Sequence, residues 1–298
     1  MCGIVGLLVK KPALRERLGE LMVPMLIGMT ERGPDSSGMA VFTRSVPDGE
    51  RKLSLYCRSA DFDWTSFLTR ARLDLQDDGQ LQVKANHAVL TTATAPATVS
   101  AWIATHYPSV HVLSTGRRID LYKDVGLPAE VAQRYDFGRL SGTHLVGHTR
   151  MATESAVTPE NAHPYTAGED WCLVHNGSLA NPGMLRRKLE KLGAHFESDC
   201  DTESACRYLH WRLGLGDDLE SALGHAFEDF DGFFTFLMGT GDKLALVRDP
   251  FACKPAVVAE TDDYVAIASE FRSLAHLPDV ANARVFEPKP AEVYSWAV

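Results

Sequence analysis

The sequence predicts an α+β fold in which two packed β-sheets are covered by helices. Apolar runs of strand length lie near both ends of the 298-residue chain, and segments with helical periodicity lie mainly between them. Strands and helices with one apolar face are stable when that face packs against another layer. A chain of this length can bury the sizeable core that such layers need.

The first 43 residues predict a strand, a helix, a loop and a second strand. Residues 2–9 are apolar without alternation, which is typical of a strand buried on both faces. The next segment predicts a helix with Pro24 as a point of bending. Its apolar face consists of Leu14, Leu18, Leu21, Met22, Met25, Leu26 and Met29. Residues 31–38 predict a loop, and residues 39–43 predict the second strand.

Residues from about 44 to 140 differ from the flanking sequence in their pattern of polar turns and short apolar segments, and this pattern predicts an insert. Polar turns interrupt this region, and strand-like segments at 82–92 and 110–114 flank a helical segment at 96–105. We therefore expect a βαβ-like insert in a parent domain that spans residues 2–298. Its histidines at 87, 106 and 111 are expected to be surface or packing residues.

The remainder of the chain alternates between strands and helices and then becomes rich in strands. Residues 145–148 and 171–175 predict strands, and three helices are expected near 181–192, 202–213 and 218–228. Asn181 as N-cap, Pro182 at the first position and Gly193 as the stop define the first of these helices. The final strands are expected at 233–238, 244–248, 256–260, 264–268 and 292–296.

Composition excludes several classes of partner. The formal net charge is −9 and no long basic cluster occurs, which argues against nucleic acid and against an anionic membrane surface. No apolar stretch approaches the roughly 20 residues that span a bilayer, and no signal peptide is recognisable. The six cysteines are scattered without zinc spacing. We expect a cytoplasmic chain with reduced thiols and no metal site.

Cys2 is the most informative residue for chemistry. Once the initiator methionine is removed, Cys2 carries a thiol and a free α-amine. Such an amine has an unperturbed pKa of roughly 7.7–8.0 and can act as the base for the thiol. The alternative interpretation is a small buried residue at the start of a strand, because free cysteine often behaves in this way.

Two further segments follow predicted strands, and each has a structural alternative. Arg150, at the end of one strand, can hold a carboxylate through two parallel hydrogen bonds, or it can be a solvated arginine. The Asn176 side-chain amide and the Gly177 N–H can form an oxyanion hole. Asn-Gly is equally a signal for a type I′ hairpin turn.

Two other segments have the same double interpretation. Asp201 precedes a predicted helix, so it can be an N-cap, as can Thr202, or Asp201 can bind a substrate ammonium. The loop with Arg32 and Gly33 can be a simple turn, or its glycine can allow close approach to a nucleophile. Together these groups form the set that an amide hydrolase acting on glutamine needs.

The chain resembles the class II, or N-terminal-nucleophile, glutamine amidotransferases. The match covers nearly the whole chain except the insert, and the motifs occur in the family's order. They are MCGIVG at 1–6, ERGPDSSG at 31–38, GHTRMAT at 147–153, NAHP at 161–164, HNG at 175–177, DTE at 201–203, RDP at 248–250 and SE at 269–270.

The resemblance implies a fold and a reaction. The family fold is a four-layer α-β-β-α sandwich of the N-terminal-nucleophile hydrolase type, which agrees with the element order above. Cys2 is implied as the nucleophile, with its own amine as base and later acid. Asn176 and Gly177 are implied as the oxyanion hole. The reaction attacks the glutamine side-chain amide, expels ammonia and hydrolyses the resulting glutamyl thioester.

The resemblance also implies the residues that bind L-glutamine. Arg150, with Thr153, would hold the α-carboxylate, and Asp201 would hold the α-ammonium. Arg32 and Gly33 would lie on the loop beside Cys2 and contribute to substrate binding. Two features depart from the family pattern. Met151 stands where many relatives carry an aromatic residue, and the insert is far longer than in the simplest members; we expect the insert to be a partner contact or a lid.

The acceptor of the ammonia is expected on another polypeptide. The sequence contains no recognisable acceptor domain, and it is similar to separately encoded amidotransferase subunits of glutamate-synthase-type complexes, including N-methylglutamate-synthase-type systems. We expect no cofactor on this chain, with flavin and iron–sulfur groups on a synthase partner. Two alternatives stay open: a free-standing amide or γ-glutamyl hydrolase of the same fold, and a non-enzymatic regulatory subunit.

Overall fold

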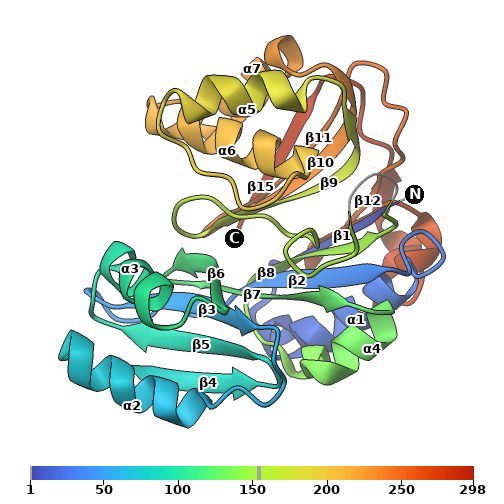
Figure 1. Ribbon diagram of the computed structural model, residues 1–298. Coiled ribbons are helices and arrows are strands. Elements are labelled where there is room, and N and C mark those ends of the chain that lie inside the picture. The colour runs from blue at the N-terminus through green and yellow to red at the C-terminus, as the bar shows by residue number, and fades with distance from the viewer. Residues whose placement is uncertain (1, 153–155) are drawn as a thin grey trace.

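The computed structural model describes residues 2–152 and 156–298, which form three sheets with helices on their outer faces (Figure 1). The largest sheet has the strand order β14-β12-β13-β1-β8-β2-β7. Its strands are β1 (Gly3–Val9), β2 (Ser36–Phe42), β7 (Ile119–Val125), β8 (His144–Arg150), β12 (Val257–Glu260), β13 (Tyr264–Ala268) and β14 (Arg284–Phe286). All of its neighbouring strands are antiparallel.

The second sheet has the order β15-β11-β10-β9 and is also antiparallel. Its strands are β9 (Trp171–Leu179), β10 (Gly232–Thr240), β11 (Lys243–Arg248) and β15 (Val293–Ala297). The outer helices are α1 (Leu18–Ile27) and α4 (Pro128–Arg134) on the first sheet, and α5 (Pro182–Glu190), α6 (Asp201–Gly214) and α7 (Leu219–Asp229) on the second. Short 3-10 turns are η1 (Pro12–Arg17), η2 (Phe137–Arg139), η3 (Phe271–Ser273) and η4 (Val280–Asn282).

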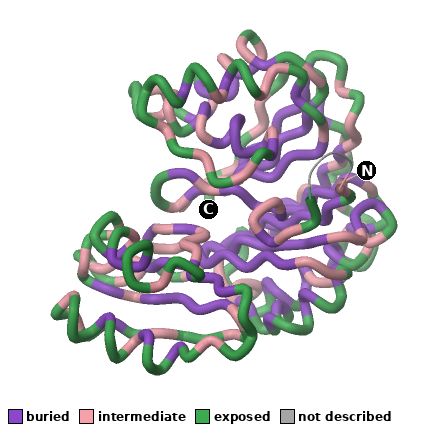
Figure 2. Tube along the Cα trace, viewed as in Figure 1, coloured by how far each residue is buried: buried purple, intermediate pink, exposed green. Residues whose placement is uncertain are grey.

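Three apolar clusters separate the layers and confirm the predicted pair of packed sheets covered by helices. One lies between α1, α4 and the large sheet, and one lies between the two sheets. A third lies between the second sheet and α5, α6 and α7. The purple core in Figure 2 follows these layers. The order is therefore helix, sheet, sheet, helix.

Strand β1 shows why an unbroken apolar run belongs at the centre of this sandwich. Val5 and Leu7 contribute to the cluster beneath α1, whereas Ile4 and Leu8 contribute to the cluster between the sheets. Alternate side chains of a strand point to opposite faces, so both faces of β1 need apolar residues. At Gly6 a Cβ would come within 2.9 Å of the Leu237 side chain, so the absence of a side chain lets the sheets approach.

The third sheet has the order β4-β5-β3-β6 and belongs to the region predicted as an insert. Its elements are β3 (Arg51–Cys57), α2 (Trp64–Leu75), β4 (Gln80–Lys84), β5 (His87–Thr92), α3 (Pro96–His106) and β6 (Val110–Gly116). Neighbouring strands are antiparallel, so β3-α2-β4 and β5-α3-β6 are each a βαβ unit with another strand between its two strands. This is a ferredoxin-like arrangement. Both helices pack on one face, over a fourth apolar cluster.

The region expected as an insert at about 44–140 is thus divided between two parts of the fold. Residues 51–116 form the ferredoxin-like unit, whereas β7 pairs with β2 in the large sheet and α4 packs beside α1. The free face of the third sheet lies on β7, where Lys52 forms an ion pair with Asp120 and Ser54 Oγ accepts the Leu121 N–H at 2.9 Å. These bonds fix the unit to the main body.

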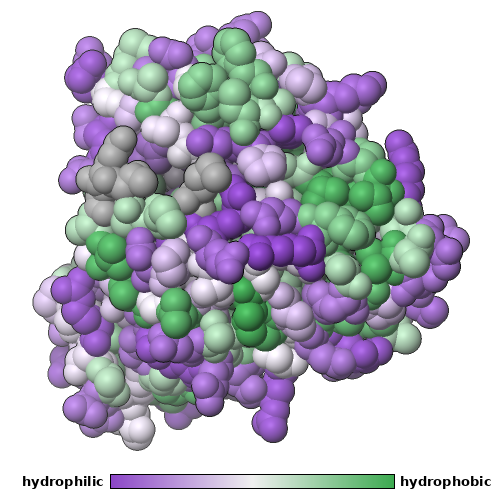
Figure 3. Space-filling model, turned by 90° about the vertical axis from the view of Figure 1, so that its right-hand side faces the viewer, coloured by the Kyte–Doolittle hydropathy of each residue, from purple (hydrophilic) through white to green (hydrophobic). Residues whose placement is uncertain are grey.

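The helices and the surface of the described residues were compared with what a membrane span requires. None of the helices in ranges 2–152 and 156–298 is long and apolar enough to cross a bilayer. On the face drawn in Figure 3, hydrophobic residues gather in separate patches between polar ones.

Candidate active site

Strand and helix ends from both sheets meet around Cys2. In the antiparallel pairing of β1 with β8, Gly3 lies opposite Thr149, so Cys2 comes beside Arg150. From the second sheet, β9 brings Gly177, and the start of α6 brings Asp201. These four residues line one cavity of about 300 Å³. The structure thus unites residues that lie up to about 200 positions apart in the sequence.

The backbone of Cys2 is fixed by Arg32 and Glu270. The Arg32 Nε donates to the Cys2 carbonyl oxygen at 3.0 Å, and its Nη1 donates to Glu270 Oε1 at 2.9 Å. Next to this ion pair, the Ile4 N–H donates to Ser269 Oγ and the Ser269 N–H to the Ile4 carbonyl, each at 3.0 Å. Arg32 was expected to contribute to substrate binding; in the structure it bonds to the Cys2 backbone and to Glu270, and it is not among the residues that line the cavity.

Gly33 lies where the loop after α1 meets β8. A Cβ at this position would collide with the Thr149 carbonyl and the Arg150 nitrogen. Farther along the same loop, the Asp35 N–H donates to the Arg150 carbonyl at 3.0 Å, and the Asp35 carboxylate accepts the Ala152 N–H at 2.8 Å. The loop therefore fixes the end of β8, where Arg150 lies.

The Cys2 thiol would need a base in order to act as the predicted nucleophile. Burial raises the pKa of the Cys2 thiol above its usual value, and a weak hydrogen bond to the Met151 carbonyl oxygen, with Sγ at 3.9 Å, offsets this rise only partly. Because the thiolate is the nucleophile and the thiol is not, a proton has to be removed before attack at neutral pH. The α-amine, which becomes available when Met1 is removed, is on the same residue.

Three buried histidines lie beside the cavity, and they are poor candidates for that base. His148 and His163 stack at 4.0 Å between ring centroids, and His175 Nδ1 lies 3.0 Å from Thr202 Oγ1. Burial lowers the pKa of His148 to about 3, and it also lowers the pKa of His163 and of His175. A general base works best when its pKa is near the working pH, so these neutral rings are better suited to holding structure.

Asn176 and Gly177 lie within a strand. β9 continues to Leu179, and Asn176 pairs with Thr235 of β10 while Gly177 pairs with Phe234, so the alternative of a hairpin turn at Asn-Gly is wrong. The Asn176 side chain is buried, and its Nδ2 has no hydrogen-bond partner among the described residues. A buried N–H donor without a hydrogen-bond acceptor costs free energy. A negative oxygen in the cavity could accept this hydrogen bond, so the arrangement fits an oxyanion donor.

Gly177 is required by close approach of the backbone. A Cβ at this position would collide with the carbonyl oxygen of Phe233, on the neighbouring strand β10. Gly177 lines the cavity, whereas its neighbour Asn176 is not among the lining residues. The two predicted oxyanion donors are therefore adjacent, with one directly at the cavity wall.

Asp201 is the first residue of α6 and not its N-cap. The N-cap is Cys200, whose side chain makes no capping hydrogen bond. One Asp201 carboxylate oxygen accepts the Leu179 N–H at 2.9 Å, and the other accepts the Thr202 hydroxyl at 3.2 Å. A carboxylate in the first turn is favoured by the helix dipole. Asp201 thereby presents a negative charge to the cavity from a rigid element.

Arg150 ends β8 and is 5% exposed. Its Nη1 donates to the Ala156 carbonyl oxygen at 3.2 Å. The cavity thus has a cation at Arg150 and an anion at Asp201, which is the charge pattern that complements an α-amino acid. Thr153, which was expected to assist Arg150, lies outside the described residues.

Sequence reasoning assigned no role to several residues that the structure brings to the site. His163 and Cys200 line the cavity, and their side chains lie 3.8 Å apart between Nε2 and Sγ. Ser269 and Glu270 fix the Cys2 strand. His163, Ser269 and Glu270 occur in the NAHP and SE motifs. The motifs marked these residues, but the sequence did not show which atoms they contact.

Comparisons with known proteins find similar sequences along the whole chain. Residues 148–276 match a family described as a glutamine amidotransferase domain. The glutamine amidotransferase-like protein GlxB of Rhizobium meliloti (strain 1021) is 48% identical over 99% of this chain and 98% of its own length. A putative glutamine amidotransferase of Methanothermobacter thermautotrophicus is 31% identical over 99% of both chains.

A solved structure extends the likeness to the fold. The glutamine phosphoribosylpyrophosphate amidotransferase of B. subtilis superposes with a TM-score of 0.63 at 19% identity. The match covers 99% of this chain and 47% of that one, so the chain spans about half the length of that protein. At this identity the likeness concerns the fold alone, and it confirms the predicted fold class.

Proposed function

Since this chain belongs to the class II glutamine amidotransferases, we propose that it hydrolyses the side-chain amide of L-glutamine through a thioester on Cys2 and passes the ammonia to a synthase partner. The observation that carries the proposal is the single cavity lined by Cys2, Arg150, Gly177 and Asp201. It supplies a nucleophile, an oxyanion donor and one charge of each sign.

The reaction begins with proton transfer within one residue. The α-amine of Cys2 takes the thiol proton, and Sγ attacks the side-chain carbonyl carbon of glutamine. The negative charge that develops on the carbonyl oxygen is received by the Gly177 N–H and the Asn176 amide, and such donors are each worth about 3 kcal/mol of barrier. Because these donors are fixed by β9–β10 pairing, they need no reorganisation during the reaction.

The intermediate then collapses towards products. The protonated amine returns its proton to the leaving nitrogen, the C–N bond breaks, and ammonia departs while a glutamyl thioester stays on Cys2. Water, activated by the same amine, attacks the thioester and releases L-glutamate with the thiol restored. Arg150 and Asp201 hold the α-carboxylate and the α-ammonium throughout.

The synthase partner is proposed to be of the glutamate-synthase type. Its support is the resemblance noted above, together with the relative GlxB, which matches along 98% of its length and carries the name of an amidotransferase. Ammonia release by the chain alone should be lower than release by the complex isolated from its source. Equal turnover in both would favour the free-standing hydrolase.

Covalent labelling tests the proposed nucleophile. Incubation with a diazoketone analogue of glutamine should add one adduct to the intact chain, and peptide mapping should place it on Cys2. The mass before labelling should show that Met1 has been removed. Excess L-glutamine should protect the thiol, because the analogue enters the same cavity. A trimmed chain that stays unlabelled, alone and in its complex, would contradict the proposal.

Replacing Arg150 by lysine should raise the KM for glutamine by at least tenfold. Lysine keeps the positive charge but cannot make two parallel hydrogen bonds to a carboxylate, and a lost charged hydrogen bond is worth about 1.5–3 kcal/mol. Steady-state ammonia release measures the effect. Arg187→Lys, on the exposed face of α5, is the matched control. An unchanged KM would remove Arg150 from glutamine binding.

A further inference from the structure

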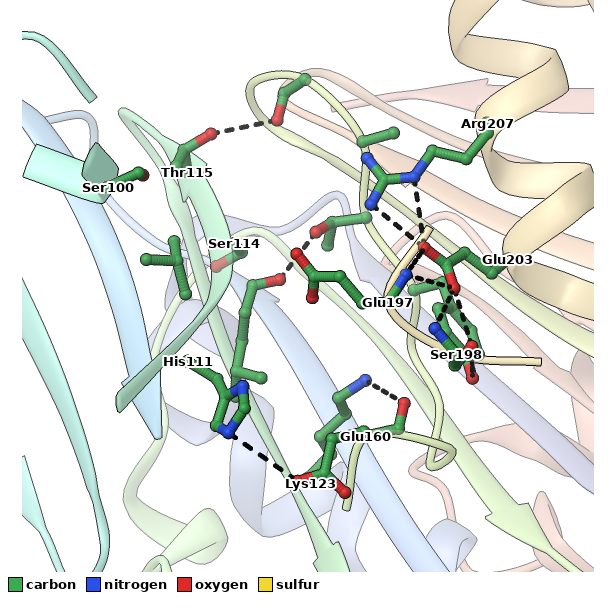
Figure 4. A pocket seen from close by; sticks show the side chains of 16 residues that line it. Ser100, His111, Ser114, Thr115, Lys123, Glu160, Glu197, Ser198, Glu203 and Arg207 are labelled. Carbon is green, nitrogen blue, oxygen red and sulfur yellow. Dashed lines mark hydrogen bonds and ion pairs between the residues drawn. The ribbon is translucent and has the colours of Figure 1, made fainter. Parts of the chain in front are cut away.

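A second cavity, of about 220 Å³, lies between the ferredoxin-like unit and the main body (Figure 4). One wall consists of β6 with Ser100 of α3, and the other consists of residues 165–168, residues 197–198 and the start of α6. Lys123 of β7 and Glu160 complete it. Within the described part of the chain, no residue lines both this cavity and the cavity around Cys2. The two are separate spaces that share α6 as a neighbour.

Lys123 supplies a buried positive charge. Its Nζ donates to the Ala162 carbonyl oxygen at 2.8 Å and to the Glu160 carbonyl oxygen at 3.4 Å, and it lies 4.7 Å from the centroid of the Tyr165 ring. An ammonium has three donors, and the third has no hydrogen-bond acceptor among the described residues. Burial lowers the pKa of Lys123 to about 8, so the group is still mostly charged at neutral pH.

Glu203 and Arg207 largely satisfy each other and hold the opposite wall in place. Glu203 accepts the N–H groups of Glu197 and Ser198, the Ser198 hydroxyl and the Arg207 guanidinium. Its carboxylate is therefore saturated. Because these bonds fix the backbone at residues 197 and 198, the Glu197 side chain projects from a defined position.

Two polar groups at the cavity stay without partners. The Ser114 side chain is 3% exposed, and its hydroxyl has no hydrogen-bond partner among the described residues. The Glu197 carboxylate has neither a hydrogen bond nor an ion pair within ranges 2–152 and 156–298. Figure 4 shows Glu197 reaching from its loop towards Ser114. A buried hydroxyl without a partner is costly, so a ligand that bonds to Ser114 would bind favourably. Glu197 is exposed, and its carboxylate adds a negative charge at the cavity wall.

We propose that this cavity binds a free α-amino acid as a second ligand, with its ammonium on Glu197, its carboxylate on Lys123 and a further polar contact to Ser114. The cavity wall carries a buried ammonium at Lys123 and an exposed carboxylate at Glu197, and one charge of each sign complements a zwitterion better than a simple anion or cation. Pockets for drug-sized ligands measure about 300–1,000 Å³, so this smaller space suits a molecule of amino-acid size.

The position of this site places its ligand next to the glutamine site. Glu203 and Asp201 lie in the same turn of α6, with Glu203 at the second cavity and Asp201 at the first. Lys123 holds the carbonyl of Ala162, the residue before His163, which lines the glutamine cavity. A ligand of the second cavity would therefore contact the elements that position the glutamine-binding residues.

The test is a binding titration of the full chain with the twenty amino acids, one at a time, followed by calorimetry. It uses an Arg150→Ala variant, so that binding at the glutamine cavity does not contribute. We expect at least one amino acid to bind at one site per chain. Glu197→Gln in the same background should weaken that binding by at least about tenfold, because it removes the charged acceptor. Glu190→Gln, an exposed residue of α5 with the same charge change, should leave it unchanged.

The outcomes separate this proposal from the proposed function. Absence of binding by any amino acid up to about 10 mM would overturn the second site, as would equal affinity in the Glu197→Gln chain. Binding of inorganic phosphate in place of an amino acid would overturn the zwitterion assignment. None of these results depends on whether Cys2 reacts with glutamine.

Discussion

The Cys2→Ala variant should lose glutamine hydrolysis by at least about 10⁴-fold while keeping its fold. Removing a covalent nucleophile leaves only the binding and oxyanion contributions, and losses of this size or larger are typical. The fold should persist because Cys2 Sγ makes only a weak hydrogen bond within the described residues, to the Met151 carbonyl oxygen at 3.9 Å. Ammonia release measures the activity, and circular dichroism with thermal unfolding measures the fold.

Cys253 offers a matched control for this substitution. Its Sγ also makes a weak contact, to the Phe251 carbonyl oxygen at 3.9 Å, and its side chain is exposed. Cys253→Ala therefore removes the same atom without touching the cavity, and its activity should equal that of the unaltered chain. Appreciable turnover by Cys2→Ala would rule out the N-terminal mechanism. Equal losses in both variants would indicate an indirect effect on folding.

The sequence was sufficient to predict four residues that the structure brings to one cavity, Cys2, Arg150, Gly177 and Asp201, because they lie at or near the ends of patterned elements. Cys2 begins an unbroken apolar run, and Arg150 closes a strand of mixed polarity, so each is recognisable as a strand-end residue without knowledge of the fold. The charge pair of Arg150 and Asp201 also follows from residue type alone. What the sequence could not provide was their distance, since it depends on the pairing of β1 with β8 and of β9 with β10.

Two features escaped sequence reasoning because they depend on contacts between distant residues. Strand β7 contains Asp120, Lys123 and Asp124, and this polar composition favoured its assignment to the insert. In the fold, Lys52 forms an ion pair with Asp120, and Lys123 donates hydrogen bonds to backbone carbonyl oxygens. These contacts satisfy the polar side chains, so the strand can be buried in the large sheet. Likewise, the Arg32–Glu270 ion pair joins residues 238 positions apart, and no local pattern predicts such a pair.

Asn176-Gly177 illustrates the opposite difficulty, in which a local signal is strong but tertiary structure overrides it. Asn-Gly is a strong hairpin signal because both residues tolerate positive φ. Here the pair stays in a strand because it is bonded along its length to β10. Gly177 is needed for close contact with Phe233, and Asn176 for its amide, so the residues serve packing and chemistry in place of a turn.

Lowering the pH from 6.5 to 4.5 should unfold this protein. Burial lowers the pKa of six histidines, to about 3 for His87, His144 and His148 and in the same direction for His163, His175 and His210. An unfolded histidine has a pKa near 6.5, so below that pH the unfolded chain binds protons that the folded chain excludes. Thermal unfolding measured between pH 8 and pH 4 would show the melting temperature falling steeply below about pH 6.5.

The size of this effect follows from the number of histidines. Each contributes about 1.4 kcal/mol per pH unit between the unfolded pKa and the folded pKa. For the three with a pKa of about 3, two pH units amount to about 8 kcal/mol, and the other three act with the same sign. A typical domain has a stability of about 5–15 kcal/mol. The stabilising contribution is complete above about pH 6.5 and is lost as the pH falls towards 3.

A single substitution can isolate one of these histidines away from the glutamine cavity. His144 stacks on Phe42 and its Nε2 lies 2.7 Å from the Thr240 carbonyl oxygen. His144→Gln keeps a hydrogen-bond donor but removes a titrating group, so the free energy of unfolding should change less steeply with pH, by about 1.4 kcal/mol per unit below pH 6.5. His195→Gln, at an exposed position, is the control and should leave the slope unchanged. A protein equally stable at pH 7 and pH 4.5 would show that these histidines are not held neutral by burial.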